Sequence, residues 1–272
     1  MEDWMQRQHI QWFSQQSSVN INGNRIDIFE FNHLPDNNIL SAWAIHFRNH
    51  YCLDTQIDLL RHPNKSRKDY LNDIKLPTLS GLGPGVRSGD FAEILVADYL
   101  EFILSYDVPR YRWQSKIIKD ESPKGSDVIG FLINNPQENN PQENDTLAIY
   151  EVKAKLSRGG KNTLQTAIDD SAKDEIRIAE SLNFIKQKSI DSNNSIRTGI
   201  VDRFQNPTDF PYKERYGAVW LVSDECCDID TIISNISTSK HPKQDALFLL
   251  IIKGHQMMDL VHELYRRVAD EA

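Results

Sequence analysis

The sequence has few cysteines, and they lack the spacing of a metal site or a disulfide framework. Its 272 residues include three cysteines, Cys52, Cys226 and Cys227. An odd number with one adjacent pair does not fit a set of disulfides, and no Cys-x-x-Cys pair is present to bind zinc. We therefore expect a reduced, cytoplasmic protein in which the thiols pack as small apolar side chains.

Long hydrophobic runs are also missing. The longest apolar segment, residues 246–252, has the length of a strand and falls far short of the roughly 20 residues that span a bilayer. The first residues lack the positive charge and the apolar stretch of a secretory signal. These absences predict a protein that does not associate with membranes.

An excess of positive charge is the third feature that the sequence lacks. Lys and Arg number 31 against 39 Asp and Glu, a net charge of −8, and 39% of the residues are hydrophobic. An acidic, globular protein does not coat nucleic acid, so contact with DNA would need a local basic surface. Residues 61–68 hold four basic side chains and no acidic one, which fits either such a surface or ordinary solvated loop charge.

Several common catalytic motifs are absent. The glycine-rich segment 79–87 lacks the GxxxxGK[ST] spacing of a phosphate-binding loop, so we interpret it as a connector. No GxSxG elbow is present to carry a nucleophilic serine. His46 and His50 are four residues apart, but without an HExxH motif we expect them to pack or to form hydrogen bonds.

Hydrophobic spacing predicts an α/β protein, with strands and helices in alternation. Apolar residues three and four apart indicate one or two helices at 39–60, a buried helix at 88–104 and helices at 162–189 and 255–270. Apolar runs predict a hairpin at 20–31 and strands at 111–118, 127–133, 146–155, 217–223 and 246–253. Residues 1–17 are interpreted as a helix or a docking arm. Residues 134–144 repeat one five-residue unit, as an exposed hairpin tip tolerates, so 127–133 and 146–155 are predicted to pair.

A group of charged residues lies on this predicted hairpin. Asp127 opens the first strand, and Glu151 and Lys153 lie two residues apart on the second. Side chains at i and i+2 share a face of a strand, so Glu151 and Lys153 point the same way while Val152 points to the opposite layer. Pairing of the strands brings Asp127 next to them. Such charges need a partner or a metal ion, because burial removes their hydration.

The residue types suit a hard divalent cation. Carboxylates, a main-chain carbonyl and waters are ligands that Mg²⁺ prefers, and Mn²⁺ accepts the same set. Such an ion polarises a phosphoryl oxygen and lowers the pKa of a bound water, which Lys153 would position. Glu93, among apolar neighbours on the helix predicted at 88–104, is assigned to the metal shell or to a hydrogen bond with Lys153. A cross-strand salt bridge, and for Glu93 a helix-end or ion-paired carboxylate, remain open.

Positive charge gathers just after the second strand. Residues 151–161 contain Lys153, Lys155, Arg158 and Lys161 but only one acidic residue. We expect Lys155, Arg158 and Lys161 to contact DNA phosphates beside the site, with solvated loop charge as the alternative.

The spacing resembles the PD-(D/E)XK nuclease superfamily. Its signature is an Asp on one core strand, Glu-x-Lys on the next and an acidic residue on the first core helix. Here Asp127 precedes Glu151-Val-Lys by 23 intervening residues, and Glu93 lies on the preceding predicted helix. A proline usually stands before the aspartate, where this sequence has Ser126, with Pro123 nearby.

This resemblance implies a restriction-endonuclease-like core, a central mixed β-sheet flanked by helices, in residues 81–272. An α/β N-terminal region at 1–80 would dock a partner. The implied activity is that of a Mg²⁺-dependent deoxyribonuclease that cuts DNA internally. The implied residues are Asp127, Glu151 and the Val152 carbonyl as metal ligands, Lys153 as the catalytic lysine and Gln165 as a supporting polar residue.

A narrower resemblance rests on residues 43–51, 67–71 and 76–77, which together with the chain length are similar to the Hachiman protein A family of anti-phage defence. That family implies a heterodimer with a superfamily 2 helicase-like subunit, which holds a DNA nuclease inactive until infection. Two other functions stay open. One is a catalytically silent, nuclease-like subunit that binds a partner or nucleic acid, and the other is a sequence-specific restriction endonuclease.

Overall fold

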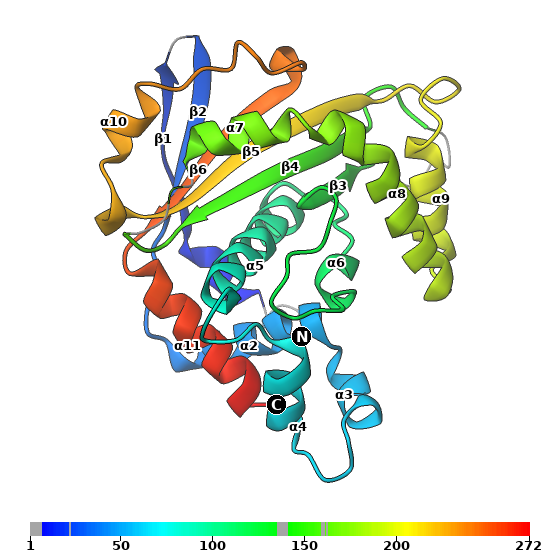
Figure 1. Ribbon diagram of the computed structural model, residues 1–272. Coiled ribbons are helices and arrows are strands. Elements are labelled where there is room, and N and C mark those ends of the chain that lie inside the picture. Colours follow the sequence, from blue (N-terminus) through cyan, green and yellow to red (C-terminus); the bar gives the residue numbers. More distant parts are fainter. Residues whose placement is uncertain (1–6, 22, 135–140, 159–160, 162) are drawn as a thin grey trace.

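Six strands form one mixed β-sheet at the centre of the structure (Figure 1). The computed structural model describes residues 7–21, 23–134, 141–158, 161 and 163–272. The strand order is β1-β2-β6-β5-β4-β3, in which β2, β6, β5 and β4 run parallel while β1 and β3 are antiparallel to their neighbours. The strands are β1 (Phe13–Ile21), β2 (Asn24–Phe31), β3 (Val128–Leu132), β4 (Thr146–Lys155), β5 (Lys213–Ser223) and β6 (Leu247–Gly254).

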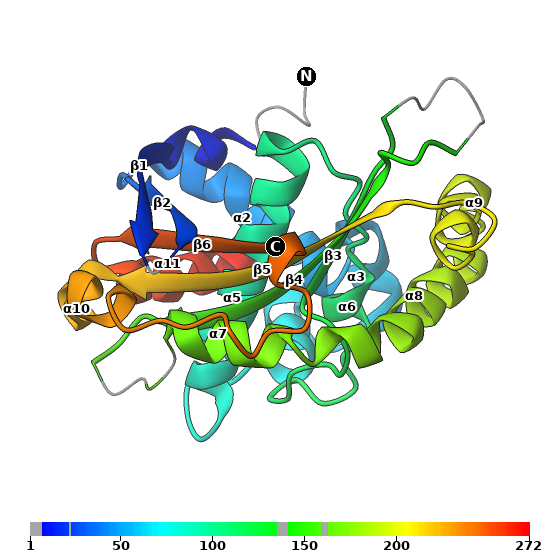
Figure 2. The same ribbon diagram turned by 90° about the horizontal axis from the view of Figure 1, so that it is seen from above.

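Helices cover both faces of the sheet. On one face lie α2, α5 and α11, and on the other lies α7 (Figures 1 and 2). The helices are α2 (Asn37–Tyr51), α3 (Asp54–Leu60), α4 (Arg67–Tyr70), α5 (Gly83–Asp98), α6 (Tyr111–Gln114), α7 (Leu164–Ser171), α8 (Asp174–Asp191), α9 (Ser195–Phe204), α10 (Ile229–Ile233) and α11 (Met257–Asp270). Short 3₁₀ or π turns occupy Gln8–Trp12, Leu71–Lys75, Tyr99–Ile103, Asp224–Cys226 and Gln244–Ala246. This is the α/β class that the sequence predicted, a central mixed sheet with flanking helices.

The most apolar strands lie in the middle of the sheet, where both faces are covered. Along β5, Val219 and Leu221 pack in the layer of α5, whereas Ala218 and Trp220 pack in the layer of α7. All four side chains are buried. Helix α5 has no exposed face along residues 90–98, as expected for a helix that is hydrophobic nearly all round.

The N-terminal hairpin and the last strand of the chain meet in the same sheet. Strand β2 pairs with β6 in parallel, and α2 packs against α11. These contacts join residues on both sides of the boundary predicted at residue 80, and that division into two regions stays a prediction. In the part of the chain that the structure describes, no helix has the length and apolar character to cross a membrane.

The N-terminal hairpin is longer than the sequence indicated. Strand β1 begins at Phe13, so part of the predicted docking arm is a strand, and Trp12 is buried in the core. The predicted turn includes Asn22, and the arm includes Trp4; both residues lie outside the described part. An alternating hydrophobic pattern does not identify β1, because this edge strand carries polar side chains at most positions.

The strand predicted at 111–118 is wrong. Residues Tyr111–Gln114 form α6, and the segment that follows is irregular. Trp113 is buried, but Ile117 is 97% exposed, so the apolar residues of this segment do not share one buried face. The apolar residues of this segment therefore gave a false strand signal.

Two further helical segments differ from the predictions. The helix predicted at 162–189 is divided into α7 and α8 by a short break, and α9 was not foreseen. The connector predicted at 79–87 ends in the first turn of α5, which begins at Gly83. The hairpin tip predicted at 134–144 lies largely outside the described residues.

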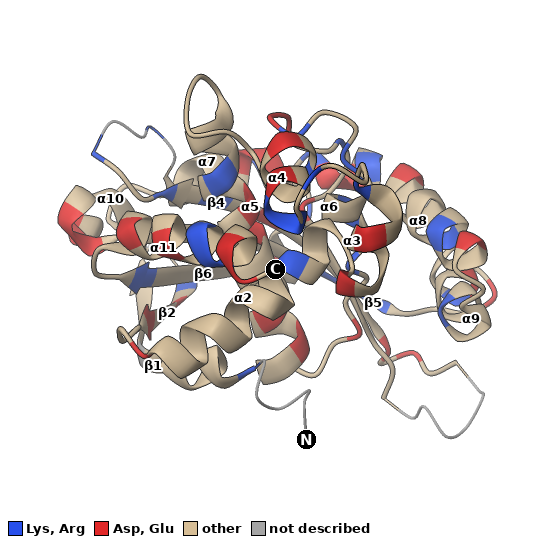
Figure 3. Ribbon diagram, turned by 90° about the horizontal axis from the view of Figure 1, so that it is seen from below, with Lys and Arg blue, Asp and Glu red and all other residues tan. Residues whose placement is uncertain are grey.

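The basic segment 61–68 does not present unpaired charge. Its four basic side chains pair with acids, and blue and red segments lie side by side around α3 and α4 (Figure 3). The pairs are Arg61 and Arg67 with Asp58, Lys65 with Asp73 and Lys68 with Asp270. This pairing favours the alternative of ordinary surface charge for the segment.

Candidate active site

The β3–β4 hairpin brings Asp127 alongside the Glu151 and Lys153 pair. Its register pairs Val128 with Tyr150, which places Asp127 opposite Glu151 and next to Val152. The Val152 N–H donates to Asp127 Oδ2 at 3.0 Å. Because the N–H and C=O of one residue in a strand point to the same side, the Val152 carbonyl also faces Asp127. The geometric prediction from the sequence is therefore confirmed at this point.

Glu151 and Lys153 share one face of β4, as their spacing predicted. Lys153 Nζ lies 2.6 Å from Glu151 Oε1 and 2.8 Å from Asp170 Oδ2. Asp170, on α7, was not foreseen from the sequence. The Val152 side chain lies in the opposite layer, within the core formed with α5. The salt bridge observed here joins two residues of the same strand to a residue of α7, so it differs from the cross-strand salt bridge that remained open as an alternative.

Glu93 reaches Asp127 through a residue that the sequence analysis missed. It is buried on α5 and accepts a hydrogen bond at 3.0 Å from Arg112 Nε on α6. Arg112 Nη2 lies 2.8 Å from Asp127 Oδ1. The hydrogen bonds of Lys153 go to Glu151 and Asp170, so the expected hydrogen bond between Glu93 and Lys153 gives way to an ion pair with Arg112. Nothing in the local sequence identified Arg112, because its segment resembled a strand.

These residues line one cleft of about 1150 Å³. Its walls come from α5, α6, the start of β3, the end of β4, α7 and α8. The charged residues along it include Glu93, Arg112, Asp127, Glu151, Lys153, Lys155, Asp170, Lys173, Arg177 and Glu180. A cleft of this size, with charged groups converging on its floor, is the default place for a binding or catalytic site.

Burial disfavours the charged form of two carboxylates in this cleft, Glu151 and Glu93. Burial raises the pKa of Glu151 from 4.5 to about 7, and the nearby Asp127 charge adds to that rise. Burial also raises the pKa of Glu93, despite the Arg112 guanidinium. For Lys153, burial alone would lower the pKa, but hydrogen bonds to Asp170 and Glu151 raise it above its ordinary value. Lys153 therefore stays protonated at neutral pH beside carboxylates that lack sufficient counter-charge.

The donor set fits a hard divalent cation. Among the described residues, Glu151 Oε2 is buried and has no hydrogen-bond partner. Asp127 and the Val152 carbonyl lie on the same side of β4. Carboxylate and carbonyl oxygens are the ligands that Mg²⁺ and Mn²⁺ prefer. A cation here would satisfy the unpaired oxygen and offset the repulsion between the carboxylates.

Ser126 ties the start of β3 to α8. This residue stands where the resemblance led us to expect a proline, and it is buried. Its hydroxyl donates to Asp174 Oδ1 at 3.0 Å, and its N–H donates to Ser181 Oγ at 3.2 Å. Burial raises the pKa of Asp174 to about 6. Ser126 therefore fixes the backbone next to Asp127 through side-chain contacts, and sequence reasoning identified neither Asp174 nor Ser181.

The remaining predicted site residues fall into two groups. Lys155 lines the cleft, whereas Arg158 and Lys161 are exposed and lie outside its lining. Gly159 and Gly160, between them, lie outside the described residues. Gln165 does not line the cleft either, because it hydrogen bonds to the Ser237 backbone at 2.8 and 3.0 Å. The residue of α7 that supports the cluster is Asp170.

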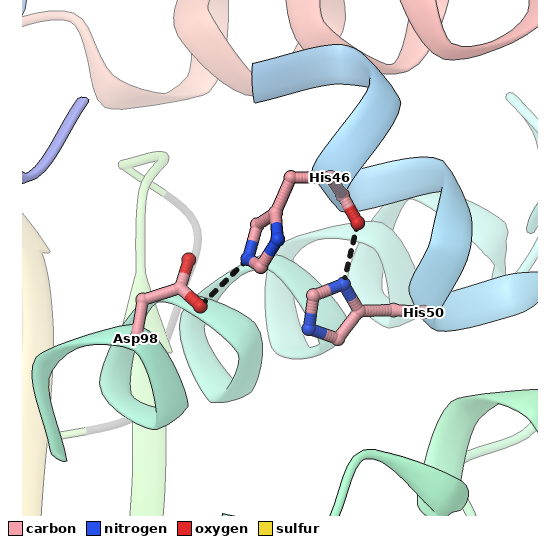
Figure 4. Close-up of side chains that lie close together, drawn as sticks. All are labelled: His46, His50 and Asp98. Carbon is pink, nitrogen blue, oxygen red and sulfur yellow. Dashed lines mark hydrogen bonds and ion pairs between the residues drawn. The ribbon is translucent and has the colours of Figure 1, made fainter. Parts of the chain in front are cut away.

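His46, His50 and Asp98 form a second polar cluster (Figure 4). Their ligand atoms lie within 4.8 Å of one another. His46 Nε2 lies 2.9 Å from Asp98 Oδ1, and His50 Nδ1 lies 2.9 Å from the His46 carbonyl. Arg110 fills the space that a metal would need, with contacts of 3.0 Å to His50 Nε2 and 2.9 Å to Asp98 Oδ1. The two histidines are hydrogen-bonded, as the sequence analysis expected.

Comparison with known proteins places nearly the whole chain, and not only the cleft, in a protein family. A search of curated proteins finds no match. A comparison with protein families matches residues 7–268 to HamA. That match includes the N-terminal hairpin, the cleft and the C-terminal helix, and the chain belongs to the HamA family.

Proposed function

We propose that this chain is a metal-dependent DNA endonuclease and the effector of a Hachiman anti-phage defence system. Membership of the HamA family supports the defence role. The observation that carries the nuclease activity is the buried, unpartnered Glu151 Oε2 beside Asp127, in the part of the chain that the structure describes. A protein keeps such a carboxylate against its desolvation cost where a ligand compensates for it.

Each residue of the cleft has a distinct part in the proposed reaction. Asp127, Glu151 and the Val152 carbonyl would hold Mg²⁺ or Mn²⁺, with Glu93 beside them. When bound, the ion polarises the scissile phosphate and lowers the pKa of a water. Lys153 orients that water and stabilises negative charge on the phosphate, since its ammonium remains protonated. Asp170 keeps the ammonium in place at 2.8 Å.

The substrate and partner follow from the same proposal. Lys155, on the wall of the cleft, and the exposed Arg158 and Lys161 would contact DNA phosphates. The net charge of −8 disfavours unguided binding to DNA. A superfamily 2 helicase-like subunit would form a heterodimer with this chain and bring it to DNA despite this charge. The same subunit would restrain the nuclease before infection. The place of action would be the cytoplasm, where phage DNA arrives.

The direct test is nicking of supercoiled plasmid by the purified chain without its partner. We expect millimolar Mg²⁺ or Mn²⁺ to support nicking, and Glu151→Gln to reduce its rate at least about a hundredfold. Glu180→Gln is the matched control, because Glu180 is exposed at the rim of the same cleft. Circular dichroism would verify that both variants fold. Equal nicking by wild type and Glu151→Gln would refute the proposal.

A catalytically silent subunit is the second candidate. The observation that favours it is the pairing of Asp127 with Arg112, because a carboxylate paired with arginine needs no metal. A calorimetric titration that detects no binding of divalent ions in any variant would support this alternative. A sequence-specific restriction endonuclease would instead give discrete bands from linear DNA, where the proposed enzyme gives a smear.

A further inference from the structure

Arg112 contacts two carboxylates and two backbone carbonyls at the cleft. Its Nε contacts Glu93 at 3.0 Å, and its Nη2 contacts Asp127 at 2.8 Å. Its Nη1 donates to the carbonyls of Lys124 at 3.2 Å and Ser126 at 2.9 Å. The side chain is only 10% exposed. Arg112 thus links the two outer carboxylates of the candidate metal centre to the segment that leads into β3.

These contacts leave the two proposed metal-binding carboxylates in different states. Both oxygens of Asp127 are engaged, Oδ1 by Arg112 and Oδ2 by the Val152 N–H. In Glu151, Oε1 contacts Lys153, whereas Oε2 has no partner among the described residues. A cation at Glu151 would therefore compete with the Arg112 guanidinium for the Asp127 carboxylate.

Arginine is a particularly effective competitor for this position. Its guanidinium keeps its charge at any accessible pH and binds carboxylates through directed hydrogen bonds. A second positive charge next to it would be repelled in a partly buried cleft. Movement of this side chain also breaks its hydrogen bonds to the Lys124 and Ser126 carbonyls. Its release would therefore loosen the segment 122–125, which lies between the contacts of Asp120 and those of Ser126.

We propose that Arg112 is a built-in counter-ion that occupies the cation position beside Asp127 and keeps the free protein poor in metal. Loading of the divalent ion displaces Arg112 from Asp127 and loosens the segment 122–125. This proposal rests on the metal centre of the proposed function and adds a regulatory element to it. This regulatory element is part of the chain itself and acts before any partner or DNA is present.

The first test is calorimetric titration of Mn²⁺ into the full chain without DNA. We expect Arg112→Gln to bind Mn²⁺ at least tenfold more tightly than wild type, and the gain to disappear in Arg112→Gln/Asp127→Asn. Arg177→Gln is the matched control, since Arg177 lines the same cleft and has no hydrogen bond to Asp127 or Glu93 in the described structure. Its affinity should stay within twofold of wild type. Arg112→Lys, which keeps the charge but loses the fork, should bind with intermediate affinity.

The second test uses wild type and so does not depend on whether a variant folds. Saturating Mn²⁺ should accelerate amide hydrogen exchange in residues 122–125 relative to the metal-free protein. Equal Mn²⁺ affinity of wild type and Arg112→Gln, or unchanged exchange at saturation, would overturn the role of Arg112 while leaving the metal centre intact. Absence of Mn²⁺ binding in every variant would instead refute the metal centre and, with it, the proposed function.

Discussion

Two of the three buried carboxylates on helix α5, Glu93 and Asp98, have opposite electrostatic surroundings. Glu93 is 5% exposed and Asp98 is 0% exposed. Burial alone would raise the pKa of both, but His46 and Arg110, with hydrogen bonds from His46 and His9, hold the pKa of Asp98 well below its ordinary value. Burial prevails at Glu93 and raises its pKa. Equal burial therefore gives opposite shifts, because the two carboxylates differ in the counter-charge around them.

The difference separates a structural network from a candidate site. Three side chains contact Asp98, with His9 at 3.0 Å, His46 at 2.9 Å and Arg110 at 2.9 Å. Glu93 has Arg112, which it shares with Asp127, and Glu151 beyond it has an oxygen without a partner in the described structure. Carboxylates with raised pKa values that converge in a cleft are typical of functional sites, whereas fully paired ones stabilise the fold.

Removal of the Asp98 charge is the strongest way to test this comparison. Asp98→Asn should lower the free energy of unfolding by about 3 kcal/mol, the low end for a broken buried ion pair, since it removes the carboxylate that His9, His46 and Arg110 share while Glu101 still pairs with Arg110. Urea denaturation at neutral pH measures the change. Glu93→Gln, on the same helix, should cause a smaller loss, because the raised pKa shows that its charged form is disfavoured. Equal losses in the two variants would remove the distinction.

The pH dependence of stability should also differ between the two regions. The folded chain retains a proton on Glu151 up to about pH 7, whereas the unfolded chain releases it near pH 4.5. The folded state thus binds more protons in this window, and the free energy of unfolding should fall as the pH rises through it, by up to about 3 kcal/mol from Glu151. Asp174, with its pKa raised to about 6, acts in the same direction. Asp98 acts in the opposite direction, because its pKa is lowered by folding. The stability that it contributes is lost as the pH falls below the ordinary pKa of an aspartate.

Denaturation midpoints from pH 4.5 to 8 in the presence of a chelator would measure the decline that Glu151 and Asp174 cause. Glu151→Gln should flatten the decline, because the amide does not titrate. Asp98→Asn, although less stable, should keep it. A decline of the same size in Glu151→Gln would assign the pH dependence to other groups.

The sequence was informative wherever the relevant distance along the chain was short or fixed by a strand. The i, i+2 spacing of Glu151 and Lys153, and their pairing with the strand that follows Asp127, predicted how these residues lie. Their proposed roles stay predictions. The apolar residues of 111–118 gave a false strand and thereby concealed Arg112.

The helical supports of the site were harder to predict. The helix predicted at 162–189 ran through the break between α7 and α8, next to which Asp170 and Asp174 lie. Asp170 meets Lys153, and Asp174 meets Ser126, across packed elements. A helical pattern specifies which face is apolar but not which polar side chain at its end reaches a neighbouring strand. The prediction of Gln165 as the supporting residue depended on position within the family pattern, and the fold places Asp170 there instead.

The smallest expected effect compares Asp170 with Gln165 on the same helix. Asp170→Asn removes the charged partner of Lys153, so we expect a decrease of about tenfold in the nicking rate, as for loss of a residue that positions a catalytic group. Gln165→Ala removes hydrogen bonds to the Ser237 backbone outside the cleft and should leave the rate within twofold of wild type. The pH–rate profile distinguishes positioning from general destabilisation, because loss of Asp170 also removes the hydrogen bond that raises the pKa of Lys153. The alkaline limb should therefore move to lower pH in Asp170→Asn alone. If Gln165→Ala instead lowered the rate and moved that limb, the support of Lys153 would lie in the first turn of α7, as the family pattern implied.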